Sequence, residues 1–162
     1  MKLVTANSTP LINLAKIGRF ELLEALFGTL TIPPAVYNEL VIRGHGRPGA
    51  EETAEASWIT VQTPSETPLL QLLAEILDRG EAEAIALAHE LKAELVLLDE
   101  LHGRRIAQSL GLRVRGTLGL LAEGYRRGLV KDIEADLRLL VAEGTWIAPA
   151  LMEQILRSLG LR

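Results

Sequence analysis

The sequence predicts an α/β protein in which a mostly parallel central sheet of about four or five strands lies between two layers of helices. Short apolar runs alternate with longer amphipathic segments, as in strand–helix–strand units. The run 95–98 is uninterrupted, which suits a parallel strand buried on both faces. Hydrophobic residues make up 48% of 162, and cysteine is absent, so we expect an aliphatic core without disulfides.

The N-terminal half is expected to hold three strands and the helices between them. Thr9 can cap a helix with Pro10 at its first position, where proline is preferred. Pro34 can open another helix in the same way, and three glycines make 43–49 a loop. The expected strands are 2–6, 29–33 and an edge strand at 58–62, and the expected helices are 10–17, 20–27, 34–41 and 50–56.

The C-terminal half continues the alternation and ends in two helices. Its expected strands are 94–98 and 113–114, and its expected helices are 69–77, 81–91, 101–110, 116–128, 132–141 and 149–159. We expect residues 1–130 to form one domain. Residues 131–162 should supply C-terminal helices that pack on that domain or at a dimer interface.

Four polar residues stand where an α/β fold places its ligands. Asn7 follows the first strand and Asp99 follows the strand 94–98, so both belong to the carboxyl edge of the sheet. Glu39 lies on the helix after the second strand, and Glu81 begins a central helix. Mg²⁺ and Mn²⁺ prefer such hard oxygen ligands. The acids therefore suggest a metal site, although each of them could also be a helix-capping or solvated residue.

Either Glu81 or Glu83 could be the metal-binding acid of the central helix. They point about 200° apart at 3.6 residues per turn. Glu81 shares its face with Ile85 and Ala88, which are core-type positions, whereas Glu83 lies on a more mixed face. We favour Glu81 as the inward acid and keep Glu83 as the second choice.

Basic residues gather in one segment, although the net charge is −4. Seven lie between 101 and 131, where Glu123 is the single acid after Leu101. A basic segment beside an acidic one fits phosphate binding around a metal, and it equally fits a solvated surface. No long apolar segment follows a basic N-terminus, so we expect no membrane segment and a cytoplasmic protein.

The chain resembles the PIN-domain family, in a small prokaryotic branch related to the toxin ribonucleases of toxin–antitoxin pairs. The matching stretches are residues 7–18, 32–40, 79–88, 97–100 and 111–120. The resemblance implies a PIN-like three-layer fold and a ribonuclease that hydrolyses RNA phosphodiester bonds with Mg²⁺ or Mn²⁺. Carried over by position, its catalytic and metal-binding residues are Asn7, Glu39, Glu81 and Asp99.

The resemblance also implies partners. Ser8 and Thr9 match the polar turn after the first acid of the family, and Thr117 lies in a Gly-Thr-Leu-Gly segment typical of the branch. Together with Arg104 and Arg105, these residues are the candidates for substrate binding. The family further implies a homodimer and a small antitoxin protein as a partner. With RNA as the implied substrate, we predict RNA on a face that carries Arg104, Arg105, Arg113 or Arg115.

Asn7 departs from the family pattern, which has Asp at this position. An amide oxygen can coordinate a hard cation, but it carries no charge and cannot bridge two ions as a carboxylate can. We therefore expect weaker metal binding and slower hydrolysis. The alternative is a catalytically degenerate PIN domain that binds RNA or a protein. A metabolite-binding α/β domain is disfavoured, because no Gly-rich phosphate loop is present.

Overall fold

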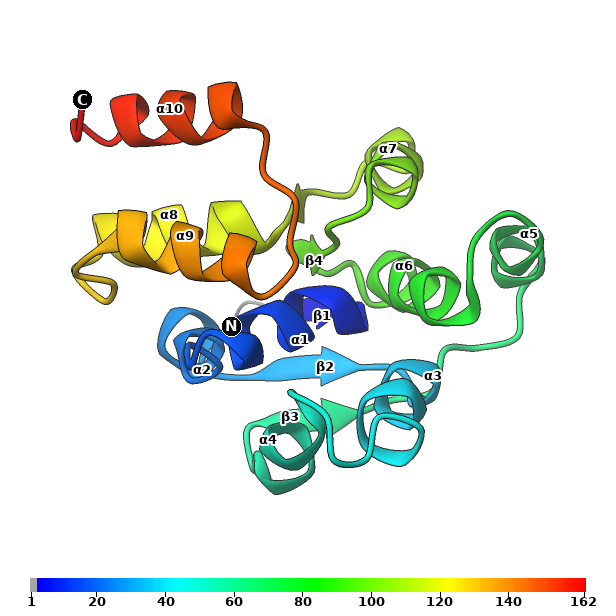
Figure 1. Cartoon of the computed structure of the whole chain (residues 1–162). Helices are drawn as coiled ribbons and strands as arrows, with labels where there is room; N and C mark the ends of the chain where they lie inside the picture. The colour runs from blue at the N-terminus through cyan, green and yellow to red at the C-terminus, as the bar shows by residue number, and fades with distance from the viewer. Residues whose placement is uncertain (1–2) are drawn as a thin grey trace.

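Five short parallel strands form the centre of the molecule (Figure 1). The computed structural model describes residues 3–162. The strands stand in the order β3-β2-β1-β4-β5, and every neighbouring pair is parallel. They are β1 (Val4–Ala6), β2 (Leu30–Ile32), β3 (Ile59–Val61), β4 (Leu95–Leu97) and β5 (Val114–Arg115). The predicted α/β class and parallel sheet are confirmed, and the edge position expected for β3 is confirmed. Lys2, the predicted start of the first strand, lies outside the described residues.

Helices connect the strands and continue beyond the last one. They are α1 (Ser8–Lys16), α2 (Leu22–Phe27), α3 (Pro34–Tyr37), the π-helical turn η1 (Asn38–Ile42), α4 (Ala50–Glu55), α5 (Pro68–Ile76), α6 (Arg79–Leu91), α7 (Leu101–Ser109), α8 (Thr117–Arg126), α9 (Ile133–Ala142) and α10 (Pro149–Ser158). The predicted start of the first helix was wrong. Asn7 is the N-cap residue of α1 and Thr9 lies within the helix, because Asn7 already has the extended backbone that a cap requires.

The sheet separates two apolar clusters, which gives the three layers. In β4 and the residue after it, Val96 and Leu98 pack with α5, α6 and α7, whereas Leu97 packs with the helices of the opposite face. This alternation follows from the two-residue period of a strand. It confirms that the apolar run 95–98 is buried on both faces.

The order of the strands places a crevice between β1 and β4. The chain leaves β1 toward β2 on one side, and it returns to β4 on the other side. Ligands of open parallel sheets bind outside the carboxyl ends of the strands at such a switch point. Ala6 pairs with Leu97 in the register of the two strands, and the Asn7 N–H donates to the Leu97 carbonyl at 3.0 Å. The segments that follow the two strands therefore start side by side.

The C-terminal helices α9 and α10 complete one apolar face. The buried apolar residues of α9 and α10 belong to the same cluster as those of α1 and α8. On α9 and α10 these residues are Ile133, Leu137, Leu140 and Leu156. Arg19 joins this region to the turn after α1, since its Nε and Nη2 donate to the two carboxylate oxygens of Asp136 at 2.8 and 3.3 Å. The division at residue 130 stays a prediction. Within residues 3–162, no helix is both long and apolar enough to cross a bilayer.

Candidate metal centre

Asn7 is a buried amide whose oxygen has no hydrogen-bond partner among residues 3–162. The residue is 6% exposed and stands at the N-cap of α1. Asparagine is a preferred N-cap because its side-chain oxygen can accept from the first turn of the helix. Asn7 makes no such bond, and its Oδ1 lies buried and unpartnered. A buried acceptor without a partner costs free energy, so the site favours a ligand that supplies a positive charge or a donor.

Three oxygen atoms converge on Gly80, at the start of α6. A β-carbon at Gly80 would lie 3.0 Å from Asn7 Oδ1, 3.2 Å from Glu39 Oε2 and 3.6 Å from Asp78 Oδ1. These oxygens come from three separate elements, the end of β1, η1 and the residue before α6. Because glycine has no side chain, the space between the oxygens stays open. The structure thus brings Asn7 and Glu39 together and adds Asp78.

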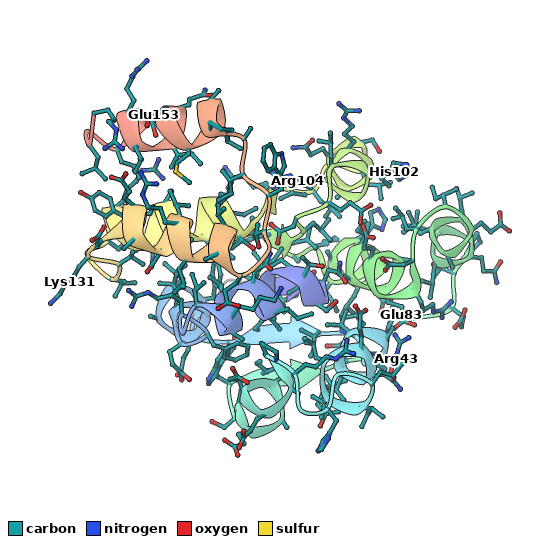
Figure 2. All side chains as sticks on the ribbon, viewed as in Figure 1. Arg43, Glu83, His102, Arg104, Lys131 and Glu153 are labelled. Carbon is teal, nitrogen blue, oxygen red and sulfur yellow. The ribbon has the colours of Figure 1, made fainter. Side chains whose placement is uncertain are left out.

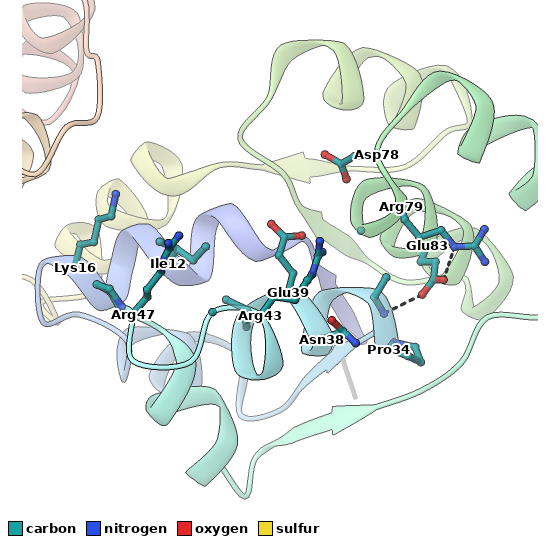
Figure 3. Close-up of a pocket in the computed structure, with 15 residues that line it drawn as sticks. Ile12, Lys16, Pro34, Asn38, Glu39, Arg43, Arg47, Asp78, Arg79 and Glu83 are labelled. Carbon is teal, nitrogen blue, oxygen red and sulfur yellow. Dashed lines mark hydrogen bonds and ion pairs between the residues drawn. The ribbon is translucent and has the colours of Figure 1, made fainter.

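Glu39 lies on the π-helical turn, which continues directly from α3. The Arg43 N–H donates to the Asn38 carbonyl at 2.8 Å, and Gly44 follows at once. A β-carbon at Gly44 would come within 2.7 Å of the Glu39 carbonyl and 2.5 Å of the Leu40 carbonyl, so a larger residue would displace this turn. Single π-helical turns occur frequently at functional sites. Here the turn ends the helix and leaves Glu39 facing the cleft (Figure 3).

Glu81 belongs to a second group of acids, with Asp78 and Glu100. One carboxylate oxygen from each of the three residues lies within 4.8 Å of the others. Glu81 is 3% exposed, and its Oε2 has no hydrogen-bond partner in the described part of the chain. Burial raises the pKa of Glu81 to about 8, and the carboxylates of Asp78 and Glu100 add to the rise. A divalent cation would reverse this effect, because it favours the ionised form of every acid around it.

Asp99 is held by Thr117 and Asn13. Its Oδ1 accepts from the Thr117 N–H at 2.7 Å, and its Oδ2 accepts from the Thr117 hydroxyl at 2.6 Å and from Asn13 Nδ2 at 3.2 Å. Thr117 is buried at the first position of α8. Thr117 was predicted as a candidate for substrate binding, and here its N–H and hydroxyl both donate to Asp99. The residue orients Asp99.

Glu83, the second choice on α6, is held in place by hydrogen bonds to both of its carboxylate oxygens. Its Oε1 accepts from the Ala35 N–H at 3.1 Å, and its Oε2 accepts from Arg79 Nε at 2.7 Å (Figure 3). Glu83 is therefore partnered at both oxygens, unlike Glu81. It joins α6 to the first turn of α3, whose N–H groups would otherwise lack partners.

The predicted substrate-binding residues lie in different settings. Ser8 is buried, Thr9 is exposed, and Arg105 is exposed. Arg104 lies beside Asp99, because a β-carbon at Gly116 would be 2.7 Å from Arg104 Nη1 and 2.6 Å from Asp99 Oδ1. A groove of about 560 Å³ runs from these two side chains past Arg115 to α10. Figure 2 shows Arg104 near α7, on the α10 side of the molecule.

The sequence interpretation missed Asp78 and Glu100. Asp78 accepts from the Glu81 N–H at 2.9 Å and so caps α6. Its position three residues before Glu81 was the available signal, since that spacing marks a helix start. Glu100 directly follows Asp99, and only the fold shows that it turns toward Glu81.

The donors around Gly80 and Glu81 fit a hard divalent cation. They are carboxylate and amide oxygens from separate elements, and two of them, Asn7 Oδ1 and Glu81 Oε2, are buried without partners. Mg²⁺ and Mn²⁺ take oxygen ligands of this kind. An ion at this place would satisfy the unpartnered oxygens and offset the repulsion among the acids.

The comparisons with known proteins identify the family. A family model, DUF3368, described as a PIN domain, matches residues 3–161. No curated protein matches the chain.

Proposed function

The chain belongs to the PIN-domain family, and from this premise we propose that it is a metal-dependent ribonuclease that hydrolyses RNA phosphodiester bonds. The observation that carries the proposal is the pair of buried, unpartnered oxygens, Asn7 Oδ1 and Glu81 Oε2, among the neighbouring acids. Groups of this kind are uncommon in a folded interior unless they serve a ligand. The fold supports the proposal, because the oxygens stand at its switch point.

We propose that Asn7, Glu39, Glu81 and Asp99 hold Mg²⁺ or Mn²⁺, with Asp78 within reach of the same space. The ion, when bound, supplies Lewis-acid activation of a water and stabilises the leaving oxygen of the phosphodiester. Other residues of the chain contribute by holding the proposed ligands in position. Thr117 orients Asp99, and Glu83 holds α6 against α3.

The test is cleavage of a fluorescently labelled single-stranded RNA in Mn²⁺. We expect Asp99→Asn and Glu81→Gln to lose most of the activity, since each removes a charged ligand. Glu75→Gln on α5 is the matched control, because Glu75 is exposed and lies outside the cleft. Equal cleavage by wild type and Asp99→Asn would mean that a contaminant cuts the RNA, and the proposal would fail.

A second candidate function rests on Asn7. A neutral amide in the place of the family's Asp favours a catalytically degenerate PIN domain that binds RNA or a protein without cutting. An Asn7→Asp variant distinguishes a disabled nuclease from a binding module. If wild type is inactive and the variant gains Mn²⁺-dependent cleavage, the protein is a disabled nuclease. If neither cuts, the binding role is favoured.

We further propose, on the family resemblance, that the protein acts as a homodimeric toxin held inactive by a small antitoxin protein. The expected result is growth arrest on expression of wild type in a bacterial host, and normal growth with Glu81→Gln. Light scattering of the purified protein measures the dimer. Normal growth with an active, well-expressed wild type would rule out the toxin role and leave the nuclease proposal intact.

A further inference from the structure

A cleft of about 910 Å³ adjoins the acids on the side of Glu39 (Figure 3). α1 contributes Ile12 and Lys16 to its lining, and the start of α6 contributes Asp78 and Gly80. Pro34 forms part of the apolar lining. The cleft therefore reaches the point where the oxygens of Asn7, Glu39 and Asp78 converge.

The cleft combines acids with cations that have no acidic partner. Arg79 lines the cleft but is paired with Glu83. Among the described residues, Lys16, Arg43 and Arg47 form no ion pair within 4.0 Å, although Arg43 follows Glu39 by four residues. Unpaired cations in a concave site raise the local concentration of an anionic ligand.

The two arginines stand on a segment with a defined shape. Arg43 is its first residue, at the end of η1, Gly44 follows, and the Arg47 N–H donates to the Gly44 carbonyl at 2.9 Å. The Ala50 N–H then donates to the Arg47 carbonyl at 3.1 Å, where α4 begins. A β-carbon at Gly49 would lie 3.4 Å from Leu40 Cδ2, so the segment is in close contact with η1. These bonds hold the backbone of the arginines beside the cleft.

We propose that Lys16, Arg43 and Arg47 form a phosphate-binding subsite for single-stranded RNA on the Glu39 side of the acidic centre. This inference rests on the proposed function and adds a place for the strand that the sequence did not predict. The groove with Arg104 and Arg115 opens on the Asp99 side, so cations flank the acids on both sides. A strand that spans both would pass its backbone across the centre. We assign the contact to phosphates, because guanidinium and ammonium groups pair with phosphate oxygens, and such contacts position a strand without reading its sequence.

The experiment measures RNA binding in EDTA, so that it does not depend on catalysis. Fluorescence anisotropy of a labelled 12-nucleotide RNA compares wild type with Arg43→Gln/Arg47→Gln. The control, Lys131→Gln/Arg157→Gln, removes the same charge outside the cleft and the groove, at exposed residues of the C-terminal region. Figure 2 shows Arg43 and Lys131 at opposite edges of the view. Thermal melting confirms that each variant is folded.

We expect the Arg43/Arg47 variant to bind about tenfold more weakly, and the slope of log affinity against log salt to fall by about 1.4 for two lost phosphate contacts. The control should change affinity less than about twofold, since distant exposed charges are screened. Inorganic phosphate should compete only at far higher concentration than RNA, because one phosphate fills one contact. Equal losses in the two double variants, or no loss in either, would overturn the subsite.

The outcome for the subsite can be separated from the outcome for the ribonuclease. RNA binding that depends on Arg43 and Arg47 without any Mn²⁺-dependent cleavage would support the subsite and contradict the ribonuclease. Mn²⁺-dependent cleavage with the same KM in wild type and the Arg43/Arg47 variant would support the ribonuclease and overturn the subsite.

Discussion

Thr117 donates both its backbone N–H and its hydroxyl to Asp99, at 2.7 Å to Oδ1 and 2.6 Å to Oδ2. One residue thus fixes both oxygens of a carboxylate. Asn13 adds a bond from α1 at 3.2 Å, so α1 and α8 are joined through the side chain of Asp99, which lies just before α7. Carboxylates that bind metals are commonly oriented in this way by a residue that does not touch the ion.

Thr117→Val should lower Mn²⁺ affinity about 10- to 100-fold, the usual effect of losing a group that orients a ligand. The valine keeps the shape of threonine but cannot donate to Oδ2. Thr117→Ser keeps the hydroxyl and should retain most of the affinity. Isothermal titration with Mn²⁺ measures both. Equal affinities for the Val variant and wild type would show that Asp99 needs no such support.

Gly80→Ala should separate folding from metal binding. Thermal melting shows whether the variant is folded, since alanine gains helix propensity while its β-carbon requires neighbouring side chains to shift. Its β-carbon would stand 3.0 Å from Asn7 Oδ1 and 3.2 Å from Glu39 Oε2, in the space between them. We expect Mn²⁺ affinity to fall about tenfold or more, on the scale of a displaced ligand. A variant with unchanged affinity would place the ion elsewhere.

The metal-free protein should lose stability as the pH rises toward about 8. Glu81 has a pKa of about 8 when folded, against an ordinary value of 4.5, so the folded protein holds a proton that the unfolded chain releases. The free energy of unfolding therefore falls with rising pH between these two values and is constant below them. Thermal melts in EDTA measure the trend. Glu81→Gln should flatten it, and Mn²⁺ should oppose it.

The Arg19–Asp136 pair should matter more for stability than the surface pairs of α9. Asp136 is buried, so Arg19→Gln leaves a buried carboxylate without its cation and should cost about 1–3 kcal/mol. Arg138→Gln removes the exposed pair with Glu134 on the same helix and should change the free energy of unfolding much less than Arg19→Gln. Urea unfolding measures both changes. Equal costs would mean that the buried pair does not hold α9 to the domain.

The sequence predicted the fold well because its main signals are local. The run 95–98 required a strand buried on both faces, and the alternation of strands with helices required a parallel sheet. The helix start at Ser8 was missed, because Pro10 is equally tolerated within the first turn of a helix and therefore did not mark its first residue.

The sequence predicted the site less completely, because the remaining features depend on tertiary contacts. The spacing of Asn7, Glu39, Glu81 and Asp99 was informative only through the family pattern. Asp78 was missed, because only the fold shows that this cap of α6 also lies beside Glu39. The cations of the cleft were not predicted, because α1 and the segment after η1 meet only in the folded chain.

Glu83 has a consequence for how mutational data on this protein should be interpreted. Its carboxylate accepts one hydrogen bond from the Ala35 N–H at the start of α3 and one from Arg79 Nε at the start of α6. The helix that carries Glu39 and the helix that carries Glu81 are thereby held at a set separation. A saturation screen would score Glu83 as intolerant to substitution, alongside the proposed ligands. Loss of activity alone would then suggest that Glu83 is a catalytic residue or a metal ligand. Its actual contribution is to set the distance between the helices that carry Glu39 and Glu81.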